Sequence, residues 1–222
     1  MTNVVIILAG GRSERMGRPK ALVTLAGMPL CLWTARAAEA MVPRPTILLV
    51  GAQEDFRAIK REIVAVQGLI ALRDTVPHCG PAAALGAVVA LMRAGRVAGP
   101  DPLTVERGVV VPTDHPLLQP RLLELLMASA TVGGLAIPVI GGRPMHLLMG
   151  FCWTTLLQRQ VTTIAPDSPM SALLRPGLDH LIAEEEVRAV DPELASAVQV
   201  STPEDLRDAE ATLARRGWKR PP

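Results

Sequence analysis

The sequence contains few aromatic residues and carries little net charge. Its 222 residues include two Phe, three Trp and no Tyr, and the formal net charge at pH 7 is +2. Proteins that bind single-stranded nucleic acid stack bases on aromatic side chains, and nucleic-acid binders in general present a basic surface. We therefore expect no nucleic acid partner for this chain.

Long apolar runs and paired cysteines are also missing. No apolar run approaches the roughly 18 residues of a membrane-spanning helix, so we expect no membrane partner. The first residues lack the basic start and the long apolar core of a secretory signal. Cys31, Cys79 and Cys152 are widely spaced without a CxxC pair, which argues against a disulfide framework and a structural zinc site. These absences favour a cytoplasmic protein.

What remains is an alternation of strand and helix patterns. Residues 4–8 form a β-branched run, typical of a strand buried on both faces. The alternation predicts an α/β fold with a mostly parallel twisted sheet and helices on both faces. After Gly141 the pattern is less regular, although 198–200 resembles a strand. The predicted strands are 4–8, 46–50, 69–72, 109–111 and 135–140, and the predicted helices are 30–41, 55–66, 81–94, 120–130 and 203–216.

The length fits one domain, because domains usually contain about 100–200 residues. We expect this domain to span residues 1–216 and to be followed by a short basic tail at 217–222. Thr202 directly precedes the last predicted helix, and Asp205 lies three residues after Thr202. This spacing is a variant of the capping box.

A glycine-containing loop follows the first predicted strand. Gly10 and Gly11 have no side chains, so backbone N–H groups there can approach an anion. Arg15 and Lys20 bring two positive charges to the same loop, which suits a triphosphate. The spacing matches neither GxGxxG nor the Walker pattern. A basic loop that only caps the sheet is the alternative.

A carboxylate follows the fourth predicted strand. Asp114 lies in the sequence Pro-Thr-Asp-His-Pro, directly after a valine run. Mg²⁺ prefers oxygen ligands, and one or two carboxylates together with substrate phosphates are sufficient to bind it. Asp114 is therefore our candidate metal ligand. An Asx turn before a proline is the structural alternative. For the neighbouring His115 we expect exposure to solvent, and a role as a metal ligand is the less favoured alternative.

These motifs resemble a known group of enzymes. The segment LAGGxSxRMGxxK at 8–20, continued by ALVTLAGMPL at 21–30, is similar to the opening of nucleotidyltransferases that have a Rossmann-like core. Within that group the sequence looks most like the molybdenum cofactor guanylyltransferases. The resemblance implies a single-domain Rossmann-like nucleotidyltransferase fold, with a nucleotide-binding half at about 1–118 and an acceptor half at about 119–216.

The resemblance also implies roles for individual residues. Asp114 would bind Mg²⁺ beside the α-phosphate, and Arg15 and Lys20 would neutralise charge on the leaving pyrophosphate; these three residues are the candidate catalytic group. The nucleotide would be bound by Leu8, Ala9, Gly10, Gly11, Arg12, Lys20, Asp74, Gly80, Pro81 and Asp114.

Asp74 is the candidate for recognition of the base. A carboxylate suits guanine, because N1–H and the exocyclic amine of guanine are both donors. In guanylyltransferases of this group a similar aspartate precedes a Gly-Pro turn, and here Gly80 and Pro81 follow Asp74. A solvated loop carboxylate is the alternative reading of Asp74.

The second half of the chain matches the family less closely. Arg143 and His146 lie in a segment that resembles the acceptor side of the family's cleft, where they would meet the phosphate of the pterin substrate. Gln199 and Ser201 stand where the family usually has asparagines, and Gly51 also stands where asparagine is frequent.

The resemblance as a whole implies transfer of GMP from GTP, with Mg²⁺, to the phosphate of molybdenum-carrying molybdopterin, and release of pyrophosphate. Transient contact with proteins that insert or deliver the cofactor is a further implied partnership. Two alternatives remain open at this point. One is a sister enzyme that uses CTP, a sugar phosphate or another cofactor precursor, and the other is a non-catalytic binding or delivery protein with the same fold.

Overall fold

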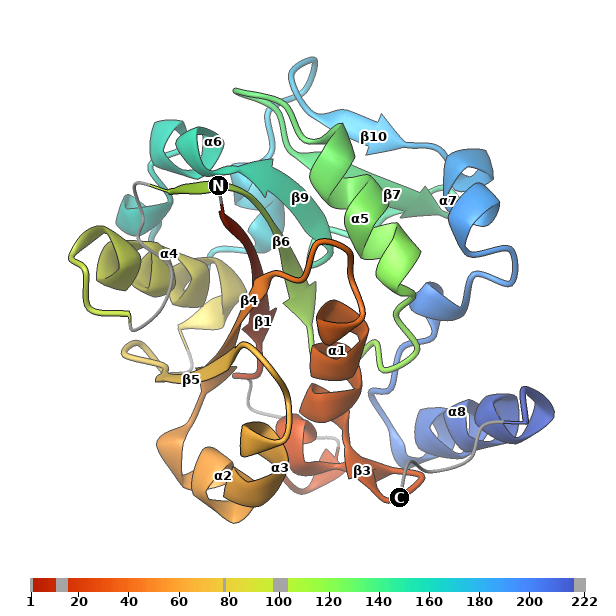
Figure 1. The fold of residues 1–222 in the computed structure, drawn as a ribbon. Helices are drawn as coiled ribbons and strands as arrows, with labels where there is room; N and C mark the ends of the chain where they lie inside the picture. The colour runs from red at the N-terminus through yellow and green to blue at the C-terminus, as the bar shows by residue number, and fades with distance from the viewer. Residues whose placement is uncertain (1, 11–15, 78, 98–103, 218–222) are drawn as a thin grey trace.

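The structure is a computed structural model that describes residues 2–10, 16–77, 79–97 and 104–217. Strands and helices alternate along most of the chain (Figure 1). The strands are β1 (Thr2–Leu8), β2 (Thr24–Leu25), β3 (Met28–Pro29), β4 (Thr46–Gly51), β5 (Leu69–Arg73), β6 (Val105–Pro112), β7 (Ala136–Ile140), β8 (Arg143–Pro144), β9 (Met149–Cys152) and β10 (His180–Ile182). The α-helices are α1 (Leu30–Glu39), α2 (Gln53–Ala58), α3 (Lys60–Val64), α4 (Gly80–Arg93), α5 (Pro120–Ser129), α6 (Trp153–Gln158), α7 (Glu184–Val190) and α8 (Pro203–Arg215).

The central sheet has the strand order β10-β7-β9-β6-β1-β4-β5, and β8 pairs with β7. β1 is parallel to both of its neighbours, with Val5 opposite Ile47 of β4 and Val109 of β6. β4 and β5 are parallel as well, whereas β9 runs antiparallel to β6 and β7. The prediction of a mostly parallel α/β sheet is therefore confirmed.

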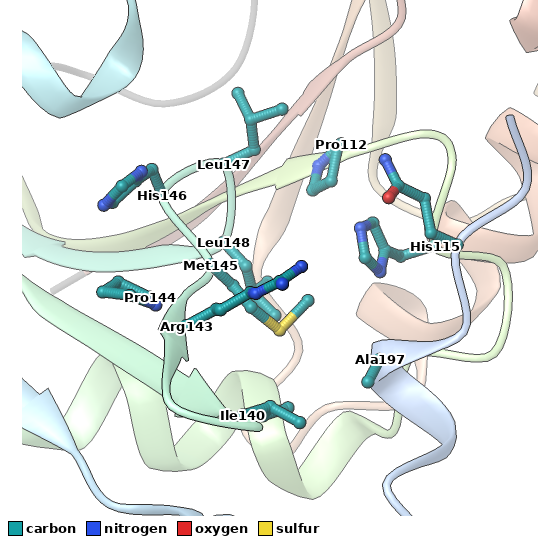
Figure 2. Close-up of a pocket in the computed structure, with 11 residues that line it drawn as sticks. Pro112, His115, Ile140, Arg143, Pro144, Met145, His146, Leu147, Leu148 and Ala197 are labelled. Atoms are coloured by element: carbon teal, nitrogen blue, oxygen red, sulfur yellow. The ribbon is translucent and has the colours of Figure 1, made fainter.

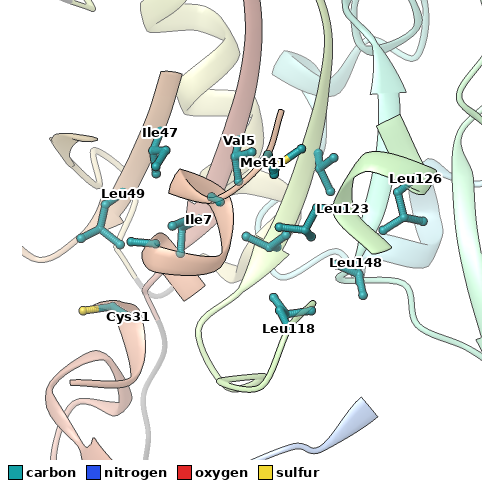
Figure 3. Close-up of a cluster of buried hydrophobic side chains, with 14 of the residues drawn as sticks. Val5, Ile7, Cys31, Met41, Ile47, Leu49, Leu118, Leu123, Leu126 and Leu148 are labelled. Carbon is teal, nitrogen blue, oxygen red and sulfur yellow. The ribbon is translucent and has the colours of Figure 1, made fainter. Parts of the chain in front are cut away.

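Helices cover both faces of the sheet, as the sequence predicted. Successive side chains of β1 point to opposite faces. Val5 and Ile7 pack with residues of α1 and α5, whereas Val4 and Ile6 pack with residues of α4 and α6. Figure 3 shows the first of these clusters, in which side chains of β1 and β4 meet those of α5 and the loop before it. All four of these β1 side chains have no exposed surface, which explains the unbroken apolar run of this strand.

A third cluster joins the C-terminal helix to the region near the N-terminus. Leu213 of α8 packs with Leu25 of β2, Trp33 of α1 and Leu117. The indole Nε1 of Trp33 donates to the carbonyl of Leu25 at 3.0 Å, which fixes the small β2–β3 hairpin against α1. This packing brings the segment before α8 next to the loop after β6.

Several boundaries differ from the sequence-based prediction. The helix expected at 55–66 is divided into α2 and α3, because Ile59 has a non-helical φ of −120°. β6 begins at Val105, earlier than predicted. No strand forms at 198–200; the backbone N–H of Val200 instead donates to the carbonyl of Asp114 at 2.7 Å.

The capping prediction for α8 is confirmed. The hydroxyl of Thr202 accepts from the backbone N–H of Asp205 at 3.2 Å, and the Asp205 carboxylate accepts from the N–H of Thr202 at 2.8 Å. Within the described part of the chain, no helix is long and apolar enough to cross a membrane.

β9 is a strand that the sequence prediction missed. Its residues Met149–Cys152 are all buried, but the strand is short and contains Gly150. A Cβ at Gly150 would lie 1.9 Å from the carbonyl oxygen of Leu126, so the glycine allows α5 to pack directly on the strand. Glycine weakens strand propensity in general, which is why this segment did not resemble a strand in the sequence.

We expect Gly150→Ala to lower the free energy of unfolding by about 3 kcal/mol, because α5 must move away from β9. Urea unfolding followed by tryptophan fluorescence measures the change. Gly141→Ala is the control, since Gly141 has a φ of +58° but no neighbour within 4 Å; its cost is the backbone strain alone, about 1–2 kcal/mol. Equal losses for the two variants would show that the close contact with α5 is unimportant.

Candidate active site

The candidate site lies where the order of the strands reverses. The chain passes from β1 to β4 and β5 on one side, and then returns to form β6 on the other side of β1. In open α/β sheets ligands bind at the carboxyl ends of the strands at such a switch point. Because β1 and β6 are parallel, the loops that follow Leu8 and Pro112 leave the sheet at the same edge.

An ion pair joins these two loops. Nζ of Lys20 lies 2.9 Å from Oδ2 of Asp114 and 3.0 Å from the hydroxyl oxygen of Ser201. Nε2 of Gln199 also donates to Oδ2 of Asp114, at 3.0 Å. The fold thus brings together two predicted site residues, Lys20 and Asp114, and two residues that depart from the family pattern, Gln199 and Ser201.

The two oxygens of Asp114 differ sharply in their contacts. Oδ2 accepts from Lys20 and Gln199, whereas Oδ1 is buried and accepts no hydrogen bond among the described residues. Burial alone would raise the pKa of Asp114, but His115, which is protonated at acid pH, together with Gln199 and Lys20, outweighs this effect and holds the pKa below its usual value. Asp114 is therefore an anion at neutral pH with one oxygen available to a cation.

His115 is buried, and our expectation that it is exposed to solvent was wrong. Only 7% of its surface is exposed, because the segment before α8 covers it. Its Nδ1 lies 3.0 Å from the carbonyl oxygen of Ser196, and its Nε2 lies 3.8 Å from Oδ1 of Asp114. Burial lowers the pKa of the imidazole, although the nearby Asp114 charge opposes this effect.

The segment before α8 is fixed to the β6 loop by buried hydrogen bonds. The carboxylate of Asp191 accepts from the N–H groups of Ala195 at 3.0 Å and Ser196 at 2.8 Å. The hydroxyl of Ser196 in turn accepts from the N–H of Gln119 at 3.0 Å. These hydrogen bonds position Gln199 beside Asp114. No periodicity or motif in the sequence predicted that this segment packs against the β6 loop.

Asp74 lies at the end of β5, on the other side of β1 from Asp114. It is 92% buried rather than solvated; its N–H donates to the carbonyl of Gly51 at 2.8 Å, and its Oδ1 accepts from the N–H of Val76 at 2.9 Å. A Cβ at Gly10 would lie 3.1 Å from Oδ2 of Asp74, so this oxygen faces the loop after β1. Three strand spacings, about 14 Å, separate the ends of β5 and β6.

The other nucleotide-side candidates lie along the same edge. Leu8 ends β1, and the N–H of Ala9 donates to the carbonyl of Val50 at 2.7 Å. Gly80, at the start of α4, has a φ of +83°, and Pro81 takes the first turn of the helix. Gly11, Arg12 and Arg15 lie outside the described residues.

Gly51, which replaces a frequent asparagine, has a packing explanation. A Cβ at this position would lie 2.9 Å from Cζ of Phe56 and 3.2 Å from Cβ of Ala9. The Phe56 ring of α2 therefore fills the space that a larger side chain at residue 51 would need.

A pocket of about 390 Å³ opens beside Asp114, and Figure 2 shows the residues that line it. Arg143 and His146 both line this pocket, so the two residues predicted for the acceptor side lie close together. The guanidinium of Arg143 points into the pocket on the side of His115, whereas the imidazole of His146 points away from His115 (Figure 2). Gln199 also lines this pocket, so the side chain that donates to Asp114 forms part of the pocket wall as well.

Comparison with known proteins places this site in context. The chain matches the family described as "MobA-like NTP transferase domain" over residues 5–186. It is 30% identical to a probable molybdenum cofactor guanylyltransferase of Natronomonas pharaonis, covering 94% of this chain and 97% of that protein. It is 29% identical to a molybdenum cofactor guanylyltransferase of Rhizobium meliloti, covering 94% and 90%.

A solved structure also shares the fold. Molybdopterin-guanine dinucleotide biosynthesis protein A of Archaeoglobus fulgidus aligns with a TM-score of 0.67 at 24% identity, over 96% of this chain and 99% of that chain. The fold, the site and the relatives together define a nucleotidyltransferase. More particularly, the chain belongs to the family of MobA-like NTP transferase domains.

We expect Gln199→Leu to raise the pKa of Asp114, because the hydrogen bond from Gln199 stabilises the charged carboxylate. An NMR titration of ¹³C-labelled aspartate carboxylates measures this change. A carboxyl group whose pKa is lowered by folding stabilises the fold above its unfolded pKa and loses that contribution as the pH falls through the folded pKa. Acid unfolding of the variant should therefore begin at higher pH. Gln158→Leu, at an exposed position, should leave both properties unchanged.

Proposed function

We propose that the protein transfers GMP from GTP to the phosphate of molybdenum-carrying molybdopterin. An oxygen of the acceptor phosphate attacks the α-phosphorus of GTP, the bond between the α-phosphorus and the bridging oxygen breaks, and pyrophosphate leaves. Such a reaction depends mainly on positioning and on neutralisation of charge. The observation that carries the proposal is the Lys20–Asp114 pair at the switch point, where Oδ1 of Asp114 accepts no hydrogen bond from the residues that the structure describes.

The nucleotide would lie across the carboxyl ends of the strands. Its guanine would meet Oδ2 of Asp74, its ribose and phosphates would pass over the loop after β1, and its α-phosphate would lie near Lys20 and Asp114. Support comes from the strand order β5, β4, β1 and β6, because the two aspartates follow β5 and β6 and so lie on opposite sides of β1. Gly10 supports the same path, since its missing side chain leaves the space beside Asp74 open.

A divalent metal fits the donors that are present. Within the described part of the chain, Oδ1 of Asp114 is a buried anionic oxygen without a hydrogen-bond partner, which is the kind of ligand that Mg²⁺ accepts together with phosphate oxygens. The bound ion would neutralise charge on the phosphates. Lys20 adds a fixed positive charge beside the same carboxylate and would stabilise the charge that develops on pyrophosphate. The acceptor phosphate is already ionised at neutral pH, so the reaction requires no general base.

The acceptor would occupy the pocket beside Asp114. Arg143 offers a guanidinium that suits a phosphate, and His146 contributes a second polar group. In this proposal residues 1–118 supply the nucleotide side and residues 119–216 supply the acceptor side of one domain. Contact with insertion or delivery proteins stays a prediction.

The non-catalytic alternative loses its main support. It depended on the replacement of two asparagines and on Gly51. Gln199 and Ser201 contact Asp114 and Lys20, so both replacements still hold the ion pair. Gly51 has a packing explanation in Phe56.

Pyrophosphate release tests the proposal. We expect release with GTP, Mg²⁺ and molybdenum-carrying molybdopterin, and much less when CTP or ATP replaces GTP. Asp114→Asn should lower the rate at least about 100-fold, because the neutral amide no longer attracts a cation or Lys20. Asp208→Asn, an exposed aspartate on α8, is the matched control. A rate for Asp114→Asn close to that of the control would remove Asp114 from the reaction, and efficient use of CTP would favour the sister cytidylyltransferases.

Recognition of guanine can be tested at Asp74. In Asp74→Asn the amide oxygen can still accept from Val76, so the amide nitrogen faces the loop after β1. This nitrogen is a donor opposite two guanine donors. We expect the preference for GTP over CTP in kcat/KM to fall roughly 10- to 100-fold, the loss expected for hydrogen bonds to a charged group. An unchanged preference would mean that the base is recognised elsewhere.

A further inference from the structure

Beside the Lys20–Asp114 ion pair, a second oxygen of Asp114 faces a ring nitrogen of His115. Oδ1 of Asp114 and Nε2 of His115 are 3.8 Å apart, which is too long for a direct hydrogen bond. Both side chains are about nine-tenths buried, at 11% and 9% exposure, so bulk water solvates neither of them well. Oδ1 accepts no hydrogen bond from any of the described residues.

The tautomer of His115 follows from its other ring nitrogen. Nδ1 lies 3.0 Å from the carbonyl oxygen of Ser196, which accepts hydrogen bonds but cannot donate them. Nδ1 therefore carries the proton, and Nε2 of the neutral ring presents its lone pair towards Asp114. The N–H of Ser196 is itself held by Asp191 at 2.8 Å. Histidines that bind metals are typically oriented in this way, by a carbonyl or carboxylate that accepts from the second ring nitrogen.

The separation of the two atoms allows both of them to reach a single ion. Bonds from a divalent cation to imidazole nitrogen and carboxylate oxygen measure about 2.1 Å, so one ion can bridge atoms up to about 4.2 Å apart. The 3.8 Å distance lies within this span. His115 also lines the pocket beside Asp114, which leaves room for phosphate oxygens and water as further ligands (Figure 2).

We propose that Nε2 of His115 and Oδ1 of Asp114 together bind the divalent cation of this site. The inference rests on the proposed function for the phosphates that complete the coordination. An imidazole ligand suits transition-metal ions, whereas Mg²⁺ prefers oxygen ligands. His115 thus gives this chain a metal preference that a carboxylate alone would not provide.

Electron spin echo spectroscopy of Mn²⁺ bound to the protein with GTP tests the inference directly. We expect modulation from a directly bound ¹⁴N nucleus, replaced by a ¹⁵N signal when the histidines are labelled with ¹⁵N. In His115→Asn the amide nitrogen can keep the hydrogen bond to Ser196, while the atom that would bind the metal is gone. This variant should lose the nitrogen signal and bind Mn²⁺ roughly tenfold more weakly, with a much smaller change for Mg²⁺. His146→Asn is the matched control, because His146 lines the same pocket but points away from His115.

The outcomes separate this inference from the proposed function. Coupling of Mn²⁺ to the ³¹P nuclei of GTP reports the metal–nucleotide complex. Phosphorus coupling without a histidine signal overturns the role of His115 and leaves the nucleotide site intact. A histidine signal without phosphorus coupling supports the His115–Asp114 site and contradicts the proposed use of GTP. Absence of Mn²⁺ binding, or loss of the nitrogen signal in His146→Asn, overturns the inference. Isotope labelling of the wild-type protein decides the question even where His115→Asn does not fold.

Discussion

The geometry of the site depends on the contacts that stabilise one buried charge, the carboxylate of Asp114. Removing a carboxylate from water is costly unless hydrogen bonds or opposite charges replace the solvent. Asp114 obtains such contacts from Lys20 after β1 and from Gln199 before α8. Its carbonyl accepts from Val200, so the same residue also anchors the backbone of the second segment. Three distant parts of the chain are thereby fixed at the carboxyl edge of the sheet.

Local signals explain what the sequence predicted correctly. The apolar runs of β1, β4 and β6, the glycine loop, and the cap formed by Thr202 and Asp205 are determined by residues close in the chain. Lys20 and Asp114 were selected for the same reason, since each follows a clearly predicted strand. Their meeting at 2.9 Å then follows from the parallel pairing of β1 and β6.

What the sequence did not predict depends on contacts between distant residues. The burial of His115 is due to Ser196, 81 positions away, and no local pattern indicates this packing. Gln199 stands where the family usually has an asparagine, and its amide donates to Oδ2 of Asp114, a contact between residues 85 positions apart. β9 was missed because its glycine, required by α5, resembles a loop residue. The roles of Arg143 and His146 stay predictions, since shared lining of a pocket establishes proximity only.

The contact between Lys20 and Ser201 spans 181 positions, and the match to the family ends before it, at residue 186. A ribosome releases the N-terminal part of a chain first, and early segments begin to fold before later ones emerge. The sheet strands β1 to β6 can assemble while residues 191–201 are still being synthesised. Lys20 and Asp114 acquire their complete set of partners only when this late segment docks. Completion of the site is in this way tied to the synthesis of residues 191–201, because a chain without them lacks the contacts that Gln199 and Ser201 make with Asp114 and Lys20.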